Sequence, residues 1–134
     1  MTDTLRFEVV TPSRRVLEGR ASEVRIPGAL GELGILPGHT PLLTSLGTGE
    51  VTWFDGDKTG CLVVQGGFAE VQPDAVTVLA SIAETVDEID LEAARTTLAE
   101  AQEKLKTVGA EEFDSVDSEV RLATARISAA GGGA

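Results

Sequence analysis

The chain has 134 residues, enough for one ordinary domain or for a small domain with an appendage. Its net charge of −11, from 11 Lys and Arg against 22 Asp and Glu, disfavours binding to nucleic acid or anionic lipid, because both need clustered basic residues. No stretch has the character of a secretory signal or of the ~20 apolar residues that cross a bilayer, and the single cysteine, Cys61, excludes an internal disulfide. We therefore expect a globular, cytoplasmic protein that reaches a membrane only through a partner.

The first part of the sequence predicts many short β-strands. Apolar and polar residues alternate in the first of them, and turns rich in Gly, Pro and Asp separate the apolar runs. The predicted strands cover residues 5–10, 23–26, 42–46, 51–54, 61–64, 68–71 and 76–79. Leu42 and Leu43 are expected in the core or at a sheet interface. Of the adjacent Trp53 and Phe54, one is expected in the core, because neighbours on a strand point to opposite faces. Many short, closely spaced strands are typical of a β-sandwich or a barrel.

After about Val86 the apolar residues recur every three or four positions, which predicts two helices. The apolar seam of the first helix contains Leu91, Ala94, Leu98, Ala101, Leu105 and Val108, and that of the second contains Phe113, Val116, Val120, Ala123, Ile127 and Ala130. Asp87 and Asp90 are candidate N-terminal caps, and Gly109 is expected to end the first helix. Two narrow seams with a short connection favour an antiparallel hairpin over residues 87–134, behind an all-β domain over residues 1–86.

The hairpin is expected to be less stable than the all-β domain. Each helix has about 15 to 20 residues, a length at which an isolated helix is marginal in water. The seams hold few large apolar groups, so the hairpin could detach or rearrange. It is also acidic, with 11 Asp and Glu against five Lys and Arg after Val86.

The sequence lacks the motifs of common catalytic sites. His39 is the only histidine, and there is no Cys-x-x-Cys or His-Glu-x-x-His zinc motif. There is also no Gly-x-Ser-x-Gly elbow and no phosphate-binding loop. Carboxylate pairs are plentiful, but a chain this acidic contains them by chance. We therefore expect neither an enzyme nor a metal site.

Two long segments carry a resemblance to a known family. They are residues 31–43, Gly-Glu-Leu-Gly-Ile-Leu-Pro-Gly-His-Thr-Pro-Leu-Leu, and residues 66–80, Gly-Gly-Phe-Ala-Glu-Val-Gln-Pro-Asp-Ala-Val-Thr-Val-Leu-Ala, with a weaker match over residues 7–12. In this order and at about this spacing they resemble the epsilon subunits of bacterial and chloroplast F-type ATP synthases. The resemblance covers about residues 4–108 well and the last helix more loosely. It implies an all-β N-terminal β-sandwich of about ten short strands followed by a C-terminal antiparallel two-helix hairpin, the same outline as the periodicity gives.

The resemblance implies a non-catalytic subunit of the F1 sector of a rotary, proton-translocating ATP synthase. In that family the sandwich lies at the foot of the central stalk, against the gamma subunit and the ring of membrane c subunits, on the cytoplasmic face of the bacterial inner membrane. The hairpin folds down on the sandwich or extends along gamma towards the alpha and beta subunits, where it inhibits ATP hydrolysis. Two other interpretations are a small nucleotide-sensing module and an unrelated β-sandwich adaptor with a helical tail.

The resemblance also suggests residues that contact partners. Glu32 and His39 match family positions in loops that face gamma and the c-ring, and polar side chains on such loops are available to a partner. The alternative is that Glu32 is a solvated turn residue and that the ring of His39 packs against Pro41.

A second pair of residues bears on nucleotide binding. Glu84 and Asp90 match positions that contact ATP on the hairpin of some family members. Ala93 stands where that motif has an arginine, and Arg121 and Arg126 lie near the family's basic positions but not at them, although a triphosphate needs converging cations. The alternative is that Asp90 caps a helix and both arginines are solvated. We expect no cofactor, with ATP binding to the hairpin the less favoured interpretation.

Overall fold

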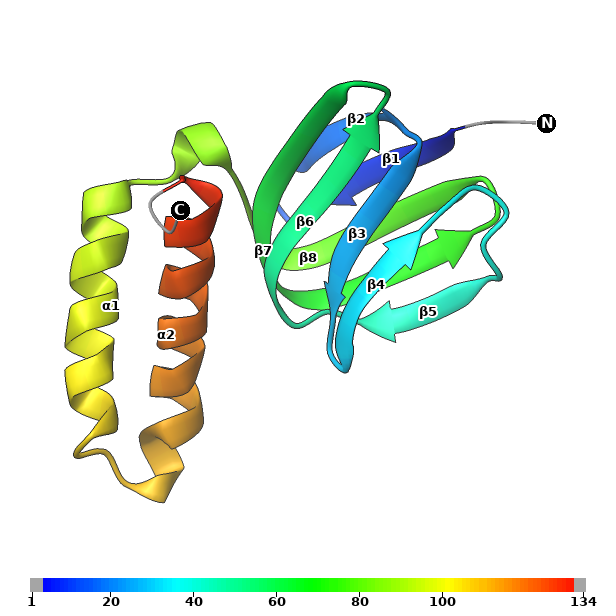
Figure 1. The fold of residues 1–134 in the computed structure, drawn as a ribbon. Helices are drawn as coiled ribbons and strands as arrows, with labels where there is room; N and C mark the ends of the chain where they lie inside the picture. Colours follow the sequence, from blue (N-terminus) through cyan, green and yellow to red (C-terminus); the bar gives the residue numbers. More distant parts are fainter. Residues whose placement is uncertain (1–3, 132–134) are drawn as a thin grey trace.

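A computed structural model describes residues 4–131 and shows eight β-strands followed by two α-helices (Figure 1). The strands are β1 (Leu5–Val10), β2 (Arg15–Ala21), β3 (Glu23–Gly28), β4 (Gly31–Ile35), β5 (Leu42–Ser45), β6 (Thr48–Asp55), β7 (Lys58–Gln72) and β8 (Ala75–Thr85). A short 3-10 helix, η1 (Val86–Glu88), leads to the helices α1 (Leu91–Leu105) and α2 (Ala110–Ala129). The predicted fold class, a β-sandwich followed by a helical hairpin, is confirmed.

Strands β7 and β8 are long enough to take part in both layers of the sandwich. Residues 58–65 of β7 pair with β6, which is followed by β3 and β4, whereas residues 68–71 of β7 pair with β5. Residues 75–79 of β8 pair with β1, which pairs with β2 at the far edge. The two long strands therefore connect the layer of β6, β3 and β4 to the layer of β5, β1 and β2 (Figure 1).

Strand β7 continues through Gly66 and Gly67, where the sequence predicts a break between two strands. Both glycines have positive φ angles, of 70° and 101°, which residues with a side chain rarely adopt. A Cβ atom on Gly67 would overlap the carbonyl oxygen of Leu79 on β8. The glycine pair thus lets the strand bend from one layer to the other without ending. This is one reason why the structure has eight strands where about ten were expected.

An apolar core lies between the two layers. Its largest fully buried side chains include Leu5, Phe7, Ile26, Ile35 and Leu62. Trp53 packs against this core, with its ring centroid 5.4 Å from that of Phe7. Phe54, on the opposite face of β6, instead lies under the guanidinium of Arg25, whose central carbon is 4.8 Å from the ring centroid. The prediction that one of the two aromatic residues belongs to the core is confirmed.

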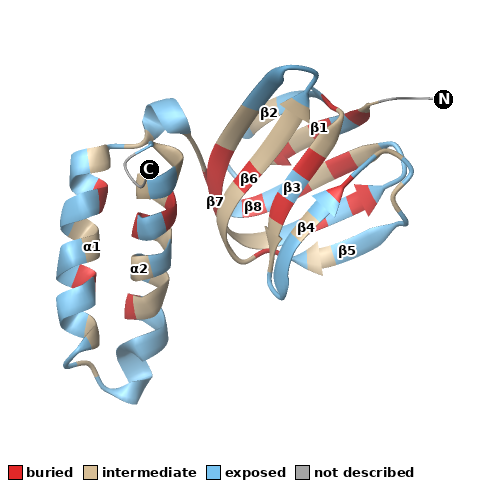
Figure 2. Ribbon diagram, viewed as in Figure 1, coloured by how far each residue is buried: buried red, intermediate tan, exposed pale blue. Residues whose placement is uncertain are grey.

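The hairpin follows both predicted seams in part, since Val108 lies beyond the end of α1 and Ala125 is buried outside the second seam. The buried positions are Ala94 and Ala101 on α1 and Val116, Ala123 and Ala125 on α2. In Figure 2 the buried stretches of α1 lie on the side of that helix that faces α2. Phe113, which was expected in the second seam, is 47% exposed. It lies in the first turn of α2, next to the connecting loop, where a side chain has fewer neighbours.

The ends of the helices agree in part with the predictions from the sequence. Asp90 caps α1 as predicted, because its carboxylate accepts a 3.0 Å hydrogen bond from the amide of Ala93. Gly109, expected to end the first helix, is instead the N-cap of α2, since α1 already ends at Leu105. Within residues 4–131, neither helix combines the length and the apolar character that crossing a membrane requires.

Candidate interaction surfaces

Glu32 and His39 lie at opposite ends of the edge strand β4. Glu32 is exposed and in register with Pro27 of β3, so it belongs to a strand and not to a loop as expected. The reason is that the turn between β3 and β4 contains only residues 29 and 30, so pairing resumes before Glu32. His39 is half-buried in the loop after β4, and its Nδ1 atom lies 2.6 Å from the carbonyl oxygen of Thr40. The five-residue strand separates these side chains into two points along one edge.

The turn between β3 and β4 presents an apolar side chain to solvent. Leu30 has a relative exposure of 105% and lies two residues from Glu32. Single exposed leucines are common on protein surfaces, so Leu30 alone identifies no site. Together, Leu30 in the turn and Glu32 in the first residues of β4 give this end of the strand an apolar and a charged group for contact with a partner.

A row of apolar side chains crosses the outside of the layer formed by β5, β7, β8 and β1. Phe68 of β7 is in register with Leu79 of β8, which is in register with Val10 of β1. Phe68 is 52% exposed and Leu79 47% exposed, and a hollow of about 400 Å³ lies beside them. Leu43 of β5, 68% exposed, extends the surface on the same side. We call Val10, Leu43, Phe68 and Leu79 the outer apolar face.

The outer apolar face was not predicted from the sequence. Alternation in β8 places Val76 and Val78 in the core, so Leu79 must point outward, where a polar residue is expected if that side meets only water. Apolar residues on both sides of one strand were therefore the available signal. Leu42 and Leu43 were expected in the core or at a sheet interface. They are 38% and 68% exposed and so lie outside the core, because β5 is a short strand paired with β7 alone.

The structure brings Glu84 and Asp90 together in a small pocket of about 230 Å³ between the end of β8 and α1. The charged groups that line it are the carboxylates of Glu84, Glu88 and Asp90 and the guanidinium of Arg126. Arg126 already donates two hydrogen bonds to Glu84, of 2.7 and 3.0 Å, and Asp90 is engaged as the cap of α1. Three carboxylates, and one arginine that is already bonded to Glu84, disfavour the binding of a triphosphate in this pocket. Among residues 4–131 no cluster of His, Cys, Asp or Glu has the arrangement of a metal site.

An ion pair fixes the segment that connects the sandwich to the hairpin. Nη2 of Arg14, in the turn between β1 and β2, donates to both carboxylate oxygens of Glu88 on η1, each at 2.8 Å. The same carboxylate accepts hydrogen bonds from the amide and the hydroxyl of Thr85, at 3.1 and 2.8 Å. These donors favour the ionised form, Arg14 most strongly, and lower the pKa of Glu88 to about 2.

Replacing Arg14 with glutamine is expected to raise the pKa of Glu88 from about 2 towards the ordinary value of about 4.3. Because the folded-state pKa is lowered, the pair contributes fully above the unfolded-state pKa and is lost as the pH falls towards about 2. NMR titration of the side-chain carboxyl carbon of Glu88 measures the change. Arg15→Gln is the matched control, because Arg15 pairs with Glu8 and Glu18 instead. An unchanged pKa in Arg14→Gln would show that Thr85 alone sets it.

The hairpin rests on the sandwich mainly through α2, while α1 packs mainly on α2 (Figure 1). Two polar contacts connect α2 to the outer side of β7 and β8. Nε2 of Gln65 donates to the hydroxyl of Ser118 at 2.9 Å, and Arg126 donates to Glu84. Val63, two residues before Gln65 on β7 and in register with Glu84 of β8, is fully buried although it is not part of the sandwich core.

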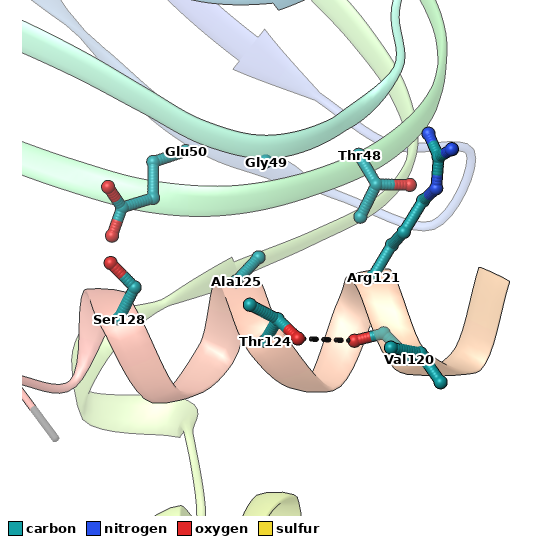
Figure 3. Close-up of a pocket in the computed structure, with 8 residues that line it drawn as sticks. All are labelled: Thr48, Gly49, Glu50, Val120, Arg121, Thr124, Ala125 and Ser128. Atoms are coloured by element: carbon teal, nitrogen blue, oxygen red, sulfur yellow. Dashed lines mark hydrogen bonds between the residues drawn. The ribbon is translucent and has the colours of Figure 1, made fainter. Parts of the chain in front are cut away.

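An open groove of about 420 Å³ separates part of α2 from β6 (Figure 3). Its walls are Thr48, Gly49 and Glu50 of β6 and Val120, Arg121, Thr124, Ala125 and Ser128 of α2. The hydroxyl of Thr124 donates to the carbonyl of Val120 in its own helix at 2.7 Å, and Arg121 pairs with Asp117 at 3.0 Å. The side chains of Thr124 and Arg121 are thus engaged within the helix. The groove indicates a loose fit of the hairpin on the sandwich.

Comparison with known proteins finds relatives of the sandwich and of the whole chain. Residues 4–86 match a family model described as ATP synthase, Delta/Epsilon chain, beta-sandwich domain. The chain is 46% identical over 111 residues to the ATP synthase epsilon chain of Koribacter versatilis, covering 83% of this chain and 78% of that one. It is 41% identical over 135 residues to the ATP synthase epsilon chain 2 of Syntrophotalea carbinolica, covering 99% and 98%.

Solved structures with the same fold extend over the hairpin as well. A chain in the cryo-EM structure of the Euglena gracilis mitochondrial ATP synthase has a TM-score of 0.84 at 22% identity, over 97% of this chain and 82% of that one. A chain in the Tetrahymena thermophila mitochondrial ATP synthase has a TM-score of 0.62 at 16% identity, over 90% and 93%. At these identities the likeness concerns the fold alone.

Proposed function

This chain belongs to the ATP synthase epsilon chain family, and on that basis we propose that it is the non-catalytic subunit that links the gamma subunit of the central stalk to the c-ring. The family assignment made from residues 31–43 and 66–80 is confirmed, and the interpretation as an unrelated adaptor is excluded. The chain associates with the membrane through the complex, on the cytoplasmic face of the bacterial inner membrane.

The outer apolar face is the observation that carries the proposed contact with gamma. It spans four neighbouring strands, and its two largest side chains, Phe68 and Leu79, are about half exposed. Contiguous exposed apolar surface on a rigid sheet is typical of a protein interface. Val10, at the end of β1, lines the hollow together with Phe68 and Leu79, and Leu43 adds an exposed apolar side chain on β5.

Glu32, His39 and Leu30 are the residues we propose for contact with the c-ring. They lie at the ends of the edge strand β4, where two turns present polar and apolar groups together. This position leaves the outer apolar face free for gamma, so one sandwich can hold both partners at the same time.

The hairpin is the proposed regulatory element. Its contacts with the sandwich run mainly through α2, and the groove beside α2 leaves that interface incompletely packed. Release of α2 would free both helices to extend along gamma towards the alpha and beta subunits, where they inhibit ATP hydrolysis. The docked hairpin then corresponds to the state that permits hydrolysis.

Reconstitution tests this function. F1 that has been depleted of its own epsilon subunit is mixed with the full chain, and binding and the rate of ATP hydrolysis are recorded. We expect stoichiometric binding and a slower rate. Binding without a slower rate would reject the inhibitory role of the hairpin and keep the linking role. No binding to the gamma-containing core would reject both roles.

A further inference from the structure

We propose that the ion pair between Arg126 and Glu84 is a latch that holds the hairpin on the sandwich without any bound ligand. Its meaning for the inhibition of ATP hydrolysis rests on the function proposed above. The docking itself is a property of the free chain and is tested on the free chain.

The geometry of this pair is that of a strong ionic contact between two parts of the molecule. Nε and Nη2 of Arg126 on α2 each donate to a different carboxylate oxygen of Glu84 on β8, at 2.7 and 3.0 Å. The two side chains are 27% and 24% exposed, which makes this the most buried ion pair among residues 4–131. A two-pronged, partly buried contact of an arginine with a carboxylate is stronger and more directional than a surface pair.

The other contacts of α2 explain why this one pair matters. Val63 is on the same side of β7 as Gln65, which contacts Ser118 of α2. Because Val63 is fully buried without belonging to the sandwich core, we infer that α2 covers it. Ser118, which accepts from Gln65, and Arg126 are eight residues apart, or about 12 Å along the helix. On the sheet side of the interface, Val63 is thus a buried apolar residue between two polar contacts, Gln65–Ser118 and Arg126–Glu84. Only the second of these contacts is charged.

Loss of Arg126 would also create repulsion. Its guanidinium is the only cation lining the pocket that contains the carboxylates of Glu84, Glu88 and Asp90. Glu88 keeps its pair with Arg14, but without Arg126 no cation lies between the carboxylates of Glu84 and Asp90, in a chain that is already strongly acidic. Glu84→Gln removes one of the three carboxylates together with the pair. We therefore expect Arg126→Gln to loosen the hairpin more than Glu84→Gln does.

Thiol labelling of a cysteine at position 63 reports on docking. Val63 is fully buried on the side of β7 that α2 contacts. In a Cys61→Ser background, Val63→Cys should react slowly with a small maleimide while the hairpin is docked and quickly when it lifts. We expect Arg126→Gln to raise the labelling rate by about tenfold and Glu84→Gln by about threefold. The charge swap Glu84→Arg with Arg126→Glu should return the rate to within about twofold of the parent.

The matched control is Arg121→Gln, which removes an arginine of the same helix that pairs only with Asp117 of that helix. Its labelling rate should equal that of the parent. Equal rates for Arg126→Gln and the parent, or an equal increase with Arg121→Gln, would overturn the latch. Hydrogen exchange of α2 amides in chains with the natural Cys61 and Val63 gives the same comparison if the introduced cysteine itself disturbs docking.

Assays of ATP hydrolysis distinguish the Arg126–Glu84 latch from the proposed inhibition of hydrolysis by the hairpin. If Arg126→Gln labels faster but inhibits depleted F1 no differently from the parent, the latch stands and the proposed braking role fails. If labelling and α2 exchange are unchanged while inhibition differs, the latch is rejected and the braking role stands.

Discussion

Replacing Gly67 with alanine is expected to destabilise the sandwich by at least about 3 kcal/mol, a large effect for the addition of one methyl group. The residue has a φ angle of 101°, and its missing Cβ leaves room for the carbonyl oxygen and the Cα of the neighbouring strand β8. A methyl group would therefore combine backbone strain with an overlap against backbone atoms that cannot rotate away. Because β7 passes between the layers at this glycine, both layers lose their shared strand when it is displaced.

Two other glycines separate the sources of this effect. Gly56→Ala introduces a side chain at a φ angle of 64° where no atom lies within 4 Å, so it should cost about 1 kcal/mol from strain alone. Gly19→Ala meets neither strain nor a neighbour and should change stability by less than about 0.5 kcal/mol. Urea unfolding followed by the fluorescence of Trp53, the only tryptophan, measures all three. A cost for Gly67→Ala no larger than that for Gly56→Ala would contradict the proposed overlap.

Replacing Phe68 or Leu79 with glutamate is expected to weaken binding to epsilon-depleted F1 by at least about 100-fold, because a charge would be buried at the centre of the gamma contact. Both side chains are about half exposed in the free chain and lie outside the sandwich core, so stability should change little. Titration of depleted F1 with labelled chain gives the affinity, and urea unfolding shows that the variant is folded.

Leu30→Glu is the matched control for this prediction. Leu30 is an exposed leucine of the same sandwich, but it lies at the turn proposed to face the c-ring, which isolated F1 does not contain. Its affinity for F1 should equal that of the parent. If all three variants bind like the parent, the outer apolar face is not where gamma binds.

The main features of the fold could be predicted from local sequence because they depend on periodicity. Alternating apolar residues indicated the strands, and the change of period after Val86 indicated the helices. The glycine pair at Gly66 and Gly67 was recognised as a break, but only the pairing of β7 with β5, β6 and β8 shows that the strand bends there and continues. Glycines mark a change of direction equally well in a turn and within a strand.

The interface between hairpin and sandwich could not be predicted because α2 is buried on two sides. Ala123 and Ala125 are both buried, although two residues on a helix are about 200° apart around its axis. Ala123 belongs to the seam that faces α1, and the apolar periodicity indicates only that side. Arg126 was therefore expected in solvent together with Arg121. Arg121 is indeed exposed, whereas Arg126 follows the second buried side and reaches Glu84.

For the candidate interaction surfaces, the sequence indicated individual residues but not the neighbouring side chains that surround them. Asp90 was placed as a helix cap, and the structure agrees. Glu32 and His39 were selected by resemblance, and their contact with partners stays a prediction. The outer apolar face needs four strands from distant parts of the sequence, so no local pattern contains it.

The measurement that most directly tests the division of roles compares the full chain with a chain that ends at Val86, each added to epsilon-depleted F1. The shorter chain retains the whole sandwich core, whose buried residues lie between Leu5 and Ala83. We predict that both bind with similar affinity and that only the full chain slows ATP hydrolysis. Equal inhibition by both chains, or binding by the full chain alone, would contradict the account in which the sandwich binds F1 and the hairpin inhibits ATP hydrolysis.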